Sequence, residues 1–261
     1  MSDIQETTDE QRVPRVVFIG LASCFGCQIN ITNIEAHLLE VLGQIDLGYW
    51  QLTSSVPMPE EFDVAVIEGA VTTTEAEDTV RQAREKAKVV ITIGACADTA
   101  GIPGMAAVDF PEKLAEVYGD TVPEACGQME PPRPVKDVIA VDYEVPCCPI
   151  DPYEFVRVLD SALYGSNYLE PTSVLCGECK RNEQGCFYED GTLCLGLVTR
   201  SGCGAKCPSL GRPCNGCAGL SPDANVNAAR TVVDRRGMEV RRFNDALGMF
   251  NTVELVKEGE E

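Results

Sequence analysis

Eight cysteines lie within residues 176–217, among many glycines and with few apolar residues at any regular spacing. Such a segment cannot bury enough apolar surface to offset the chain entropy that it loses on folding. Bound metal would supply the missing stabilisation, because ligand binding and folding are coupled in such segments. The sequence therefore predicts two domains, a regular one over residues 12–165 and a cysteine-rich one over residues 166–261.

The start of the chain bears on the redox state of these thiols. MSDIQETTDEQ has neither the basic start and apolar core of a secretory signal nor a twin-arginine pair. No apolar stretch approaches the ~20 residues that cross a bilayer. We therefore expect a cytoplasmic protein with no membrane span, in which fourteen cysteines indicate metal or redox chemistry in preference to disulfides.

Charge excludes one class of function. The chain has 41 acidic and 21 basic residues, which gives a formal charge of -20 at pH 7. Such a charge repels nucleic acid and anionic lipid over most of a surface. We expect no nucleic-acid partner, and an acidic, solvated surface is the simplest explanation of the charge.

The first 165 residues alternate between strand-like and helix-like patterns. Short runs rich in Val and Ile are typical of buried parallel strands, and apolar residues at helical spacing separate them. The predicted strands are 14–20, 63–67, 88–93 and a further one near 138–143, and the predicted helices are 28–43, 75–87 and 151–164. This order predicts an α/β fold with a flavodoxin-like, doubly wound parallel sheet. Residues 119–137, which hold four prolines, are expected to form a long irregular insertion.

Four cysteines follow predicted strands of this sheet. Cys24 and Cys27 lie in ASCFGCQIN, Cys96 in TIGACA and Cys148 in VPCCPI. Because the carboxyl ends of parallel strands line one edge, four thiolates from three loops would converge there. They are the ligand set of one four-iron four-sulfur cluster or of one structural zinc. A thioredoxin-like dithiol would also explain CxxC at a helix start, but that fold needs only one pair of cysteines.

The cysteine-rich segment has a stronger pattern. Its cysteines form two sets of four, with glycine and proline between them: Cys176, Cys179, Cys186 and Cys194, then Cys203, Cys207, Cys214 and Cys217. Two zinc ribbons would also use eight cysteines, so a zinc-stabilised structural or interaction protein remains an alternative. Together with the first four, however, the cysteines make three sets of four, which favours a chain of three 4Fe-4S clusters.

These motifs resemble those of a known family. ASCFGCQINI, VIEGAVTT, TIGACA, CPI and CLGLVTRSGCGAKCP with CNGC are similar to the small, electron-transferring subunit of nickel-iron hydrogenases. The resemblance covers most of residues 14–220. It is closest to the soluble group that includes sulfhydrogenase delta subunits and the viologen- and deazaflavin-reducing hydrogenases of methanogens.

The resemblance implies a place for each cluster. A flavodoxin-like domain would carry the proximal cluster beside the nickel-iron site of a separate large subunit, and the cysteine-rich domain would carry the other two. The implied ligands are Cys24, Cys27, Cys96 and Cys148 for the proximal cluster, Cys176, Cys179, Cys186 and Cys194 for the distal cluster, and Cys203, Cys207, Cys214 and Cys217 for the medial cluster. The division of Cys186, Cys194 and Cys203 between distal and medial clusters remains open.

Further features of these motifs concern single residues. Glu68, in the EG motif, would lie near the proximal cluster, although a strand-end carboxylate capping the next turn explains it equally well. Cys176 replaces the histidine that ligates the distal cluster in the membrane-bound branch. Cys126 and Cys147 are surplus to the three sets, and we interpret both as structural or incidental.

The resemblance also implies a function. The chain would be the hydrogenase subunit that relays electrons during reversible hydrogen oxidation, from the nickel-iron site of the large subunit through proximal, medial and distal clusters. A partner with flavin or iron-sulfur clusters, linked to NAD(P), deazaflavin or heterodisulfide, would take the electrons. A cluster subunit like that of respiratory complex I is a second alternative, but that relative carries one cluster and lacks the cysteine-rich extension.

Overall fold

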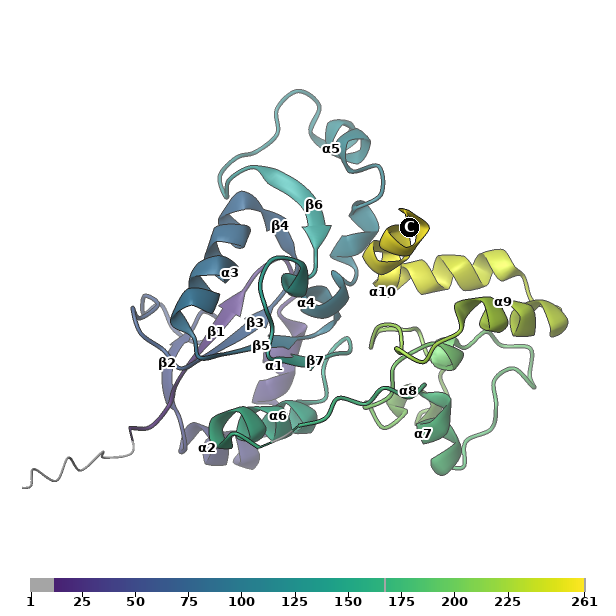
Figure 1. Ribbon diagram of the computed structural model, residues 1–261, viewed down its shortest axis with the longest axis horizontal. Helices are drawn as coiled ribbons and strands as arrows, with labels where there is room; N and C mark the ends of the chain where they lie inside the picture. The colour runs from purple at the N-terminus through teal and green to yellow at the C-terminus, as the bar shows by residue number, and fades with distance from the viewer. Residues whose placement is uncertain (1–11, 167, 261) are drawn as a thin grey trace, which may run out of the picture.

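The core of the protein is a five-stranded parallel sheet with helices on both faces (Figure 1). The computed structural model describes residues 12–166 and 168–260, so the predicted lack of a signal segment, which rests on residues 1–11, lies outside it. The sheet order is β2-β1-β3-β5-β7. Its strands are β1 (Arg15–Gly20), β2 (Asp46–Trp50), β3 (Val64–Glu68), β5 (Val89–Ile93) and β7 (Tyr143–Val145). This order confirms the predicted flavodoxin-like, doubly wound sheet.

Each face of the sheet has its own apolar core because side chains alternate along a strand. From β1, Val16 and Phe18 pack on one face and Val17 and Ile19 on the other. The first face is covered by α1 (Gly26–Thr32), α2 (Ala36–Leu42) and α6 (Pro152–Tyr164), and the second by α3 (Thr74–Lys86) and α4 (Ala95–Thr99). The helices predicted at 75–87 and 151–164 are thus confirmed.

Two sequence predictions need correction. The pattern at 28–43 forms two helices, because the chain turns at Glu35, where φ is +44°. The strand expected near 138–143 is β7, which begins only at Tyr143 and follows the short 3-10 helix η2 (Val135–Asp137). Val138 and Val141 pack against the second core from this loop, which explains their apolar character without a strand.

The proline-rich insertion is also more regular than predicted. Within residues 119–137, β6 (Met129–Arg133) pairs antiparallel with β4 (Val71–Thr73) in a separate two-stranded sheet. Prolines are tolerated there because a strand of such a small sheet has an unpaired edge. The 3-10 helix η1 (Pro103–Ala106) and α5 (Phe110–Tyr118) lead into this insertion.

The cysteine-rich part has little regular structure. Among its described residues it contains only α7 (Cys176–Arg181), the 3-10 helix η3 (Leu195–Leu197) and α8 (Lys206–Ser209) before two longer helices, α9 (Val226–Arg235) and α10 (Val240–Glu260). Val233, Phe243 and Leu247 of these helices form a small core with Tyr188 and Leu195. The cysteine-rich segment is therefore anchored on one side by an apolar core of its own.

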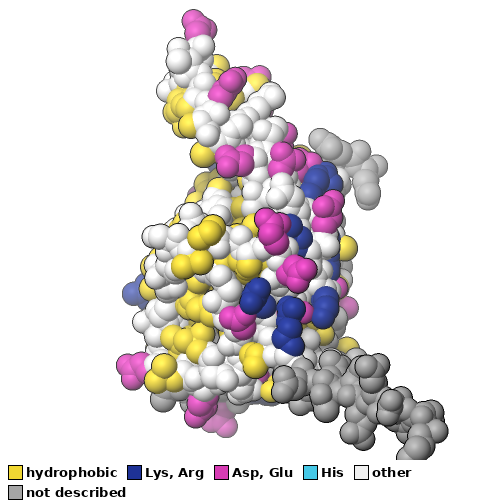
Figure 2. All heavy atoms as spheres, turned by 90° about the vertical axis from the view of Figure 1, so that its left-hand side faces the viewer, with side chains coloured by type: hydrophobic (Ala, Val, Ile, Leu, Met, Phe, Trp, Pro, Cys, Tyr) yellow, Lys and Arg dark blue, Asp and Glu magenta, His cyan; other side chains and the backbone are white. Residues whose placement is uncertain are grey.

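The C-terminal helix returns to the sheet part of the molecule. α10 packs against η1 and α4, and the Thr99 hydroxyl donates a hydrogen bond to the Phe250 carbonyl at 2.7 Å (Figure 1). No helix in the described ranges 12–166 and 168–260 has the length and apolar character needed to cross a membrane. On the face seen in Figure 2, basic side chains are interspersed with acidic and apolar ones, so acidic groups do not cover it uniformly.

Candidate metal centres

The structure brings the first four predicted ligands together at the carboxyl edge of the sheet. Cys24 and Cys27 follow β1, Cys96 lies in α4 after β5, and Cys148 follows β7. Burial, and after it the neighbouring Cys148, Cys24 and Glu68, raise the pKa of the Cys96 thiol to about 12. The pKa of Cys27 is raised by burial and then by Glu68, Cys148 and Cys96. Each of the four thiols therefore lies within electrostatic range of at least one of the others.

Glu68 holds the helix that carries Cys27. Its carboxylate is buried, with 2% exposed, and accepts hydrogen bonds from the backbone N–H groups of Cys27 at 3.2 Å and Gln28 at 3.1 Å. A helix start has N–H groups without intrahelical partners, which a carboxylate satisfies. The sequence analysis considered that Glu68 caps the turn after its own strand. In the structure the carboxylate caps the start of α1 instead.

Gly94 is a site residue that the sequence analysis missed. It ends β5 with φ at +84°, and a Cβ atom placed on it would lie 2.4 Å from Sγ of Cys27. Only glycine allows this conformation and this approach of the thiol. The signal in the sequence was the Gly of TIGACA at a strand end.

A second group of thiols surrounds a cavity in the cysteine-rich part. The cavity measures about 440 Å³, part of it open to solvent, and its thiols are Cys176, Cys179, Cys186 and Cys194. Apolar and aromatic side chains, among them Leu175 and Tyr188, form its walls. Burial, and after it Cys194, Cys179 and Cys186, raise the pKa of Cys176 to about 11. These four predicted ligands therefore lie together in space as well as in sequence.

The third group lies between the other two. A cavity of about 460 Å³, partly open to solvent, has the thiols Cys203, Cys207, Cys214 and Cys217 in its wall, together with Cys148 of the first group. Burial raises the pKa of Cys214 to about 12. Gly216 N–H donates to Sγ of Cys214 at 3.4 Å, and Cys214 N–H donates to Sγ of Cys194 in the second group at 3.2 Å. The three groups thus form a continuous row.

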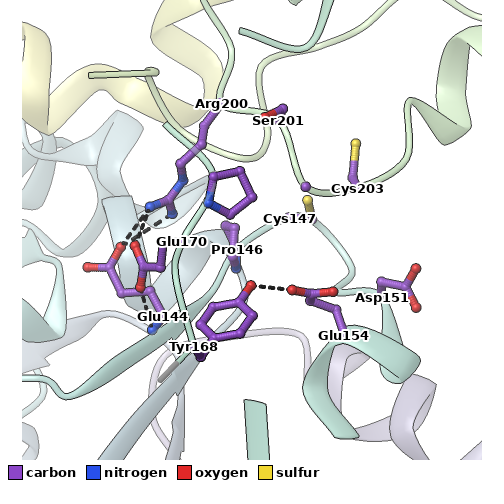
Figure 3. A pocket seen from close by; sticks show the side chains of 12 residues that line it. Glu144, Pro146, Cys147, Asp151, Glu154, Tyr168, Glu170, Arg200, Ser201 and Cys203 are labelled. Carbon is purple, nitrogen blue, oxygen red and sulfur yellow. Dashed lines mark hydrogen bonds and ion pairs between the residues drawn. The ribbon is translucent and has the colours of Figure 1, made fainter. Parts of the chain in front are cut away.

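The two surplus cysteines differ from each other. Cys126 is exposed in the proline-rich insertion. Cys147 is buried and lies within electrostatic range of Cys203 and Cys217 of the third group. It lies at one side of the cavity in Figure 3, which Arg200, Glu144 and Glu170 also line.

The chemistry of the donor sets fits iron-sulfur clusters. Each group offers four cysteine thiols, which is the ligand set of a 4Fe-4S cluster. Thiolate is the form that binds metal, and the positive charge of bound iron offsets the burial, and after it the mutual repulsion, that raise the pKa of most of these thiols. Within the described part of the chain, no three His, Cys, Asp or Glu side chains are arranged to hold a single metal ion.

Comparison with known proteins identifies the family. Residues 24–162, more than half of the chain, match the family described as NADH ubiquinone oxidoreductase, 20 Kd subunit. A protein of the F420-non-reducing hydrogenase vhu of Methanocaldococcus jannaschii is 34% identical, over 92% of this chain and 94% of that protein. The delta subunit of sulfhydrogenase 2 of Pyrococcus furiosus is also 34% identical, over 79% of this chain and 86% of that protein.

A solved structure agrees with these relatives. A chain of an NAD+-reducing [NiFe]-hydrogenase in the H2-reduced state superposes with a TM-score of 0.55 at 26% identity, over 61% of this chain and 96% of that chain. The protein therefore belongs to the NADH ubiquinone oxidoreductase 20 Kd subunit family of redox subunits. Within it, the chain is a member of the nickel-iron hydrogenase small-subunit group, whose relatives extend over the cysteine-rich part as well.

Proposed function

We propose that this chain is the electron-transfer subunit of a cytoplasmic nickel-iron hydrogenase and holds three 4Fe-4S clusters. It would relay electrons between the nickel-iron site of a separate large subunit and a flavin or iron-sulfur partner during reversible hydrogen oxidation. One observation carries the proposal: twelve thiols form three groups of four, and neighbouring groups touch through Cys148 and through the bond from Cys214 to Cys194.

The grouping in space supports one assignment of ligands. We assign Cys24, Cys27, Cys96 and Cys148 to the proximal cluster, within the domain at residues 12–165. In the domain at residues 166–261, Cys203, Cys207, Cys214 and Cys217 hold the medial cluster and Cys176, Cys179, Cys186 and Cys194 the distal cluster. Cys186 and Cys194 go to the distal cluster because they share its cavity, and Cys203 goes to the medial cluster for the same reason.

The protein's own contribution is to hold and tune these groups. Bound clusters supply one-electron redox chemistry, and no residue of this chain needs to act as a nucleophile or general base. Glu68 fixes α1 and with it Cys27. Backbone N–H groups of Gly216 and Cys214 donate to thiol sulfurs, and such bonds adjust the potential of a cluster. Tyr188 and Leu175 shield the distal group from water.

Metal analysis of the intact complex tests the proposal. The complex is purified without oxygen through a tag on this chain and analysed for iron, acid-labile sulfide, zinc and nickel, with low-temperature EPR. We expect about 12 irons per copy of the chain, beyond those of any flavoprotein partner, and one nickel from a large subunit. Zinc in place of iron and sulfide, without a nickel-bearing partner, would support the scaffold alternative and refute the proposal.

Matched cysteine variants test the assignment of ligands to the clusters. Cys179→Ser and Cys207→Ser each remove one thiol from a different group and should each lower the iron content by about four, with the loss of one EPR signal. Cys126→Ser is the control, because that thiol is exposed and belongs to no group. Equal iron in all three variants would contradict the assignment of ligands.

A further inference from the structure

Charge is unevenly distributed along this chain. Residues 176–250 hold ten basic and eight acidic residues, whereas the rest of the chain holds 11 basic and 33 acidic residues. The cysteine-rich part, up to the middle of α10, is therefore weakly basic, and the sheet part is strongly acidic. Such a separation of charge orients a charged partner, because one end of the molecule attracts what the other end repels.

The basic side chains of the two parts also differ in their partners. Within the described ranges 12–166 and 168–175, every Lys and Arg except Lys113 forms an ion pair with a carboxylate, and Lys113 donates to the Met105 carbonyl. Cations without a carboxylate partner are available to another molecule. In the described cysteine-rich part, six exposed basic side chains form neither an ion pair nor a hydrogen bond: Lys180, Arg181, Arg212, Arg235, Arg236 and Arg242.

Three of these six lie at the turn between α9 and α10, whose backbone is fixed. Gly237 has φ at +72°, and the Met238 N–H donates to the Val233 carbonyl at 3.1 Å, which is the hydrogen bond of a Schellman motif. A hydrogen bond from Arg230 Nε to Asn244 Oδ1 at 2.9 Å joins the two helices. We call the four arginines held on this backbone the basic turn: Arg235, Arg236, Arg241 and Arg242.

Two arginines of the basic turn lie where a helix disfavours them. Arg241 and Arg242 are in the first turn of α10, which has no acidic residue. A helix N-terminus carries a partial positive charge, so cations there destabilise the helix. Arg241 is 3.8 Å from Asp245, but both side chains are exposed and such a pair contributes little. Residues that break a local rule without a gain for the fold are expected at functional surfaces.

The basic turn adjoins the distal group. Met238 and Val240, within the turn, pack against the same apolar core as Cys186 and Cys194. Tyr188 belongs to that core, and its hydroxyl donates to the Cys194 carbonyl at 2.8 Å. α9 and the start of α10 lie at the end of the molecule away from β2 (Figure 1). Because the distal group ends the row of thiols, a protein docked on this turn lies next to the point where electrons leave the chain.

We propose that the basic turn is the docking surface for an acidic face of the redox protein that exchanges electrons with the distal group. A basic face would be drawn to the strongly negative sheet part, at the wrong end of the molecule. An acidic face is repelled there and attracted by the basic turn, which orients it for electron transfer. Residues 230–245 hold five arginines and three acidic residues, so the turn stays basic when its neighbours are included. This inference rests on the proposed function and adds the chemistry of the partner.

Charge reversal in the intact complex tests this surface. The complex is purified without oxygen through a tag on this chain, and its redox subunit is the one with flavin, or with iron beyond that of this chain. Retention of that subunit is measured by sedimentation from low to high salt. Arg235→Glu with Arg242→Glu reverses two charges of the turn, and Arg235→Lys with Arg242→Lys keeps them. Arg81→Glu with Lys86→Glu is the matched control, because it makes the same change of charge on α3.

We expect the reversed variant to bind the redox subunit about tenfold more weakly at low salt and to lose most of the salt dependence of the wild type. The lysine variant and the control should bind like the wild type. A carbodiimide that joins amines directly to carboxylates should link position 235 or 242 of the lysine variant to an Asp or Glu of the redox subunit. The wild type cannot form these links, since a guanidinium stays protonated.

Four results would overturn the inference. Equal retention in the reversed variant and the control would make the turn a solvated surface only. Links to the large subunit alone would assign the turn to another contact. Loss of binding to phosphatidylserine vesicles, with retention of the redox subunit unchanged, would make it a lipid-binding surface. A wild-type complex without a redox subunit at low salt would also refute it. The proposed function is tested separately by iron, which should stay at about 12 per chain in every variant.

Discussion

The close approach of Cys27 to Gly94 predicts that Gly94→Ala disables the proximal site. Gly94 has φ at +84° and ψ at 156°, a region almost exclusive to glycine, so a Cβ atom adds about 1–3 kcal/mol of backbone strain. The new atom would also lie 2.4 Å from Sγ of Cys27, and the thiol must retreat by about 1 Å, at a further ~1–3 kcal/mol for overpacking. The total destabilisation is about 2–6 kcal/mol.

The assay combines stability with metal content. Urea unfolding of the anaerobic protein gives the loss in free energy, and iron analysis should show about eight irons in place of about 12, with the proximal EPR signal missing. Gly165→Ala is the matched control, since it also has positive φ but no atom within 4 Å of the new Cβ. It should cost about 1–2 kcal/mol and retain all iron. Full iron in Gly94→Ala, with no greater loss of stability than in the control, would refute the reasoning.

Three further predictions concern buried or paired charges. Arg200→Met removes the ion-pair partner of Glu170 and one of the two partners of Glu144, which keeps Lys136, and should lower the unfolding free energy by about 3 kcal/mol in urea titrations. Glu68→Ala removes the acceptor for two N–H groups at the start of α1 and should cost about 1–3 kcal/mol by the same measurement. Asp63→Asn should cost about 1 kcal/mol at pH 7 and nothing near pH 2.

The pH dependence of Asp63 follows from its surroundings. Partial burial raises its pKa, but the backbone N–H of Arg15 and the side chains of Lys88 and Arg12 outweigh it and lower the pKa to about 2. A lowered pKa stabilises the fold above the usual value of 3.8, and this contribution is lost as the pH falls towards 2. A constant difference between Asp63→Asn and wild type from pH 7 to pH 2 would contradict this account.

A different result would contradict the prediction for each of the variants Arg200→Met and Glu68→Ala. A change below about 1 kcal/mol in Arg200→Met would mean that solvent reaches the pair and screens it. Glu68→Gln is the control for Glu68→Ala, because its amide oxygen still accepts a hydrogen bond. Equal losses in the two Glu68 variants would show that the charge, and not the capping of α1, is what matters.

The fold was predictable where a single strand carries its own signal. β1, β3 and β5 are buried on both faces, so their apolar runs appear directly in the sequence. β2 gives no such signal, because its five residues are partly exposed at the edge of the sheet and include Asp46 and Gly48. The sequence analysis also missed the pairing of β6 with β4. Prolines in β6 argue against a strand, although a strand that forms hydrogen bonds along one edge only can contain them.

Some features of the candidate sites were also predictable from the sequence and others were not. Spacing alone grouped the cysteines of the second part, because each set of four lies within about twenty residues and short glycine-rich loops can close around one centre. The same spacing gave no place to Cys147, which lies in the wall of a cavity with Cys203, more than fifty residues away. Gly94 and Glu68 act on Cys27 from the ends of other strands; both residues stand out in the sequence, but their contacts with Cys27 do not.

The sequence by itself determined the parallel sheet, the family and the number of thiols, since these depend on residue types and spacings within short segments. Only the tertiary structure decided that Cys186 and Cys194 share one cavity and Cys203 another, and that Glu68 and Gly94 contact Cys27. The physical reason is that contacts between loops at one sheet edge depend on the order of strands and on the packing of α10, which no local pattern encodes.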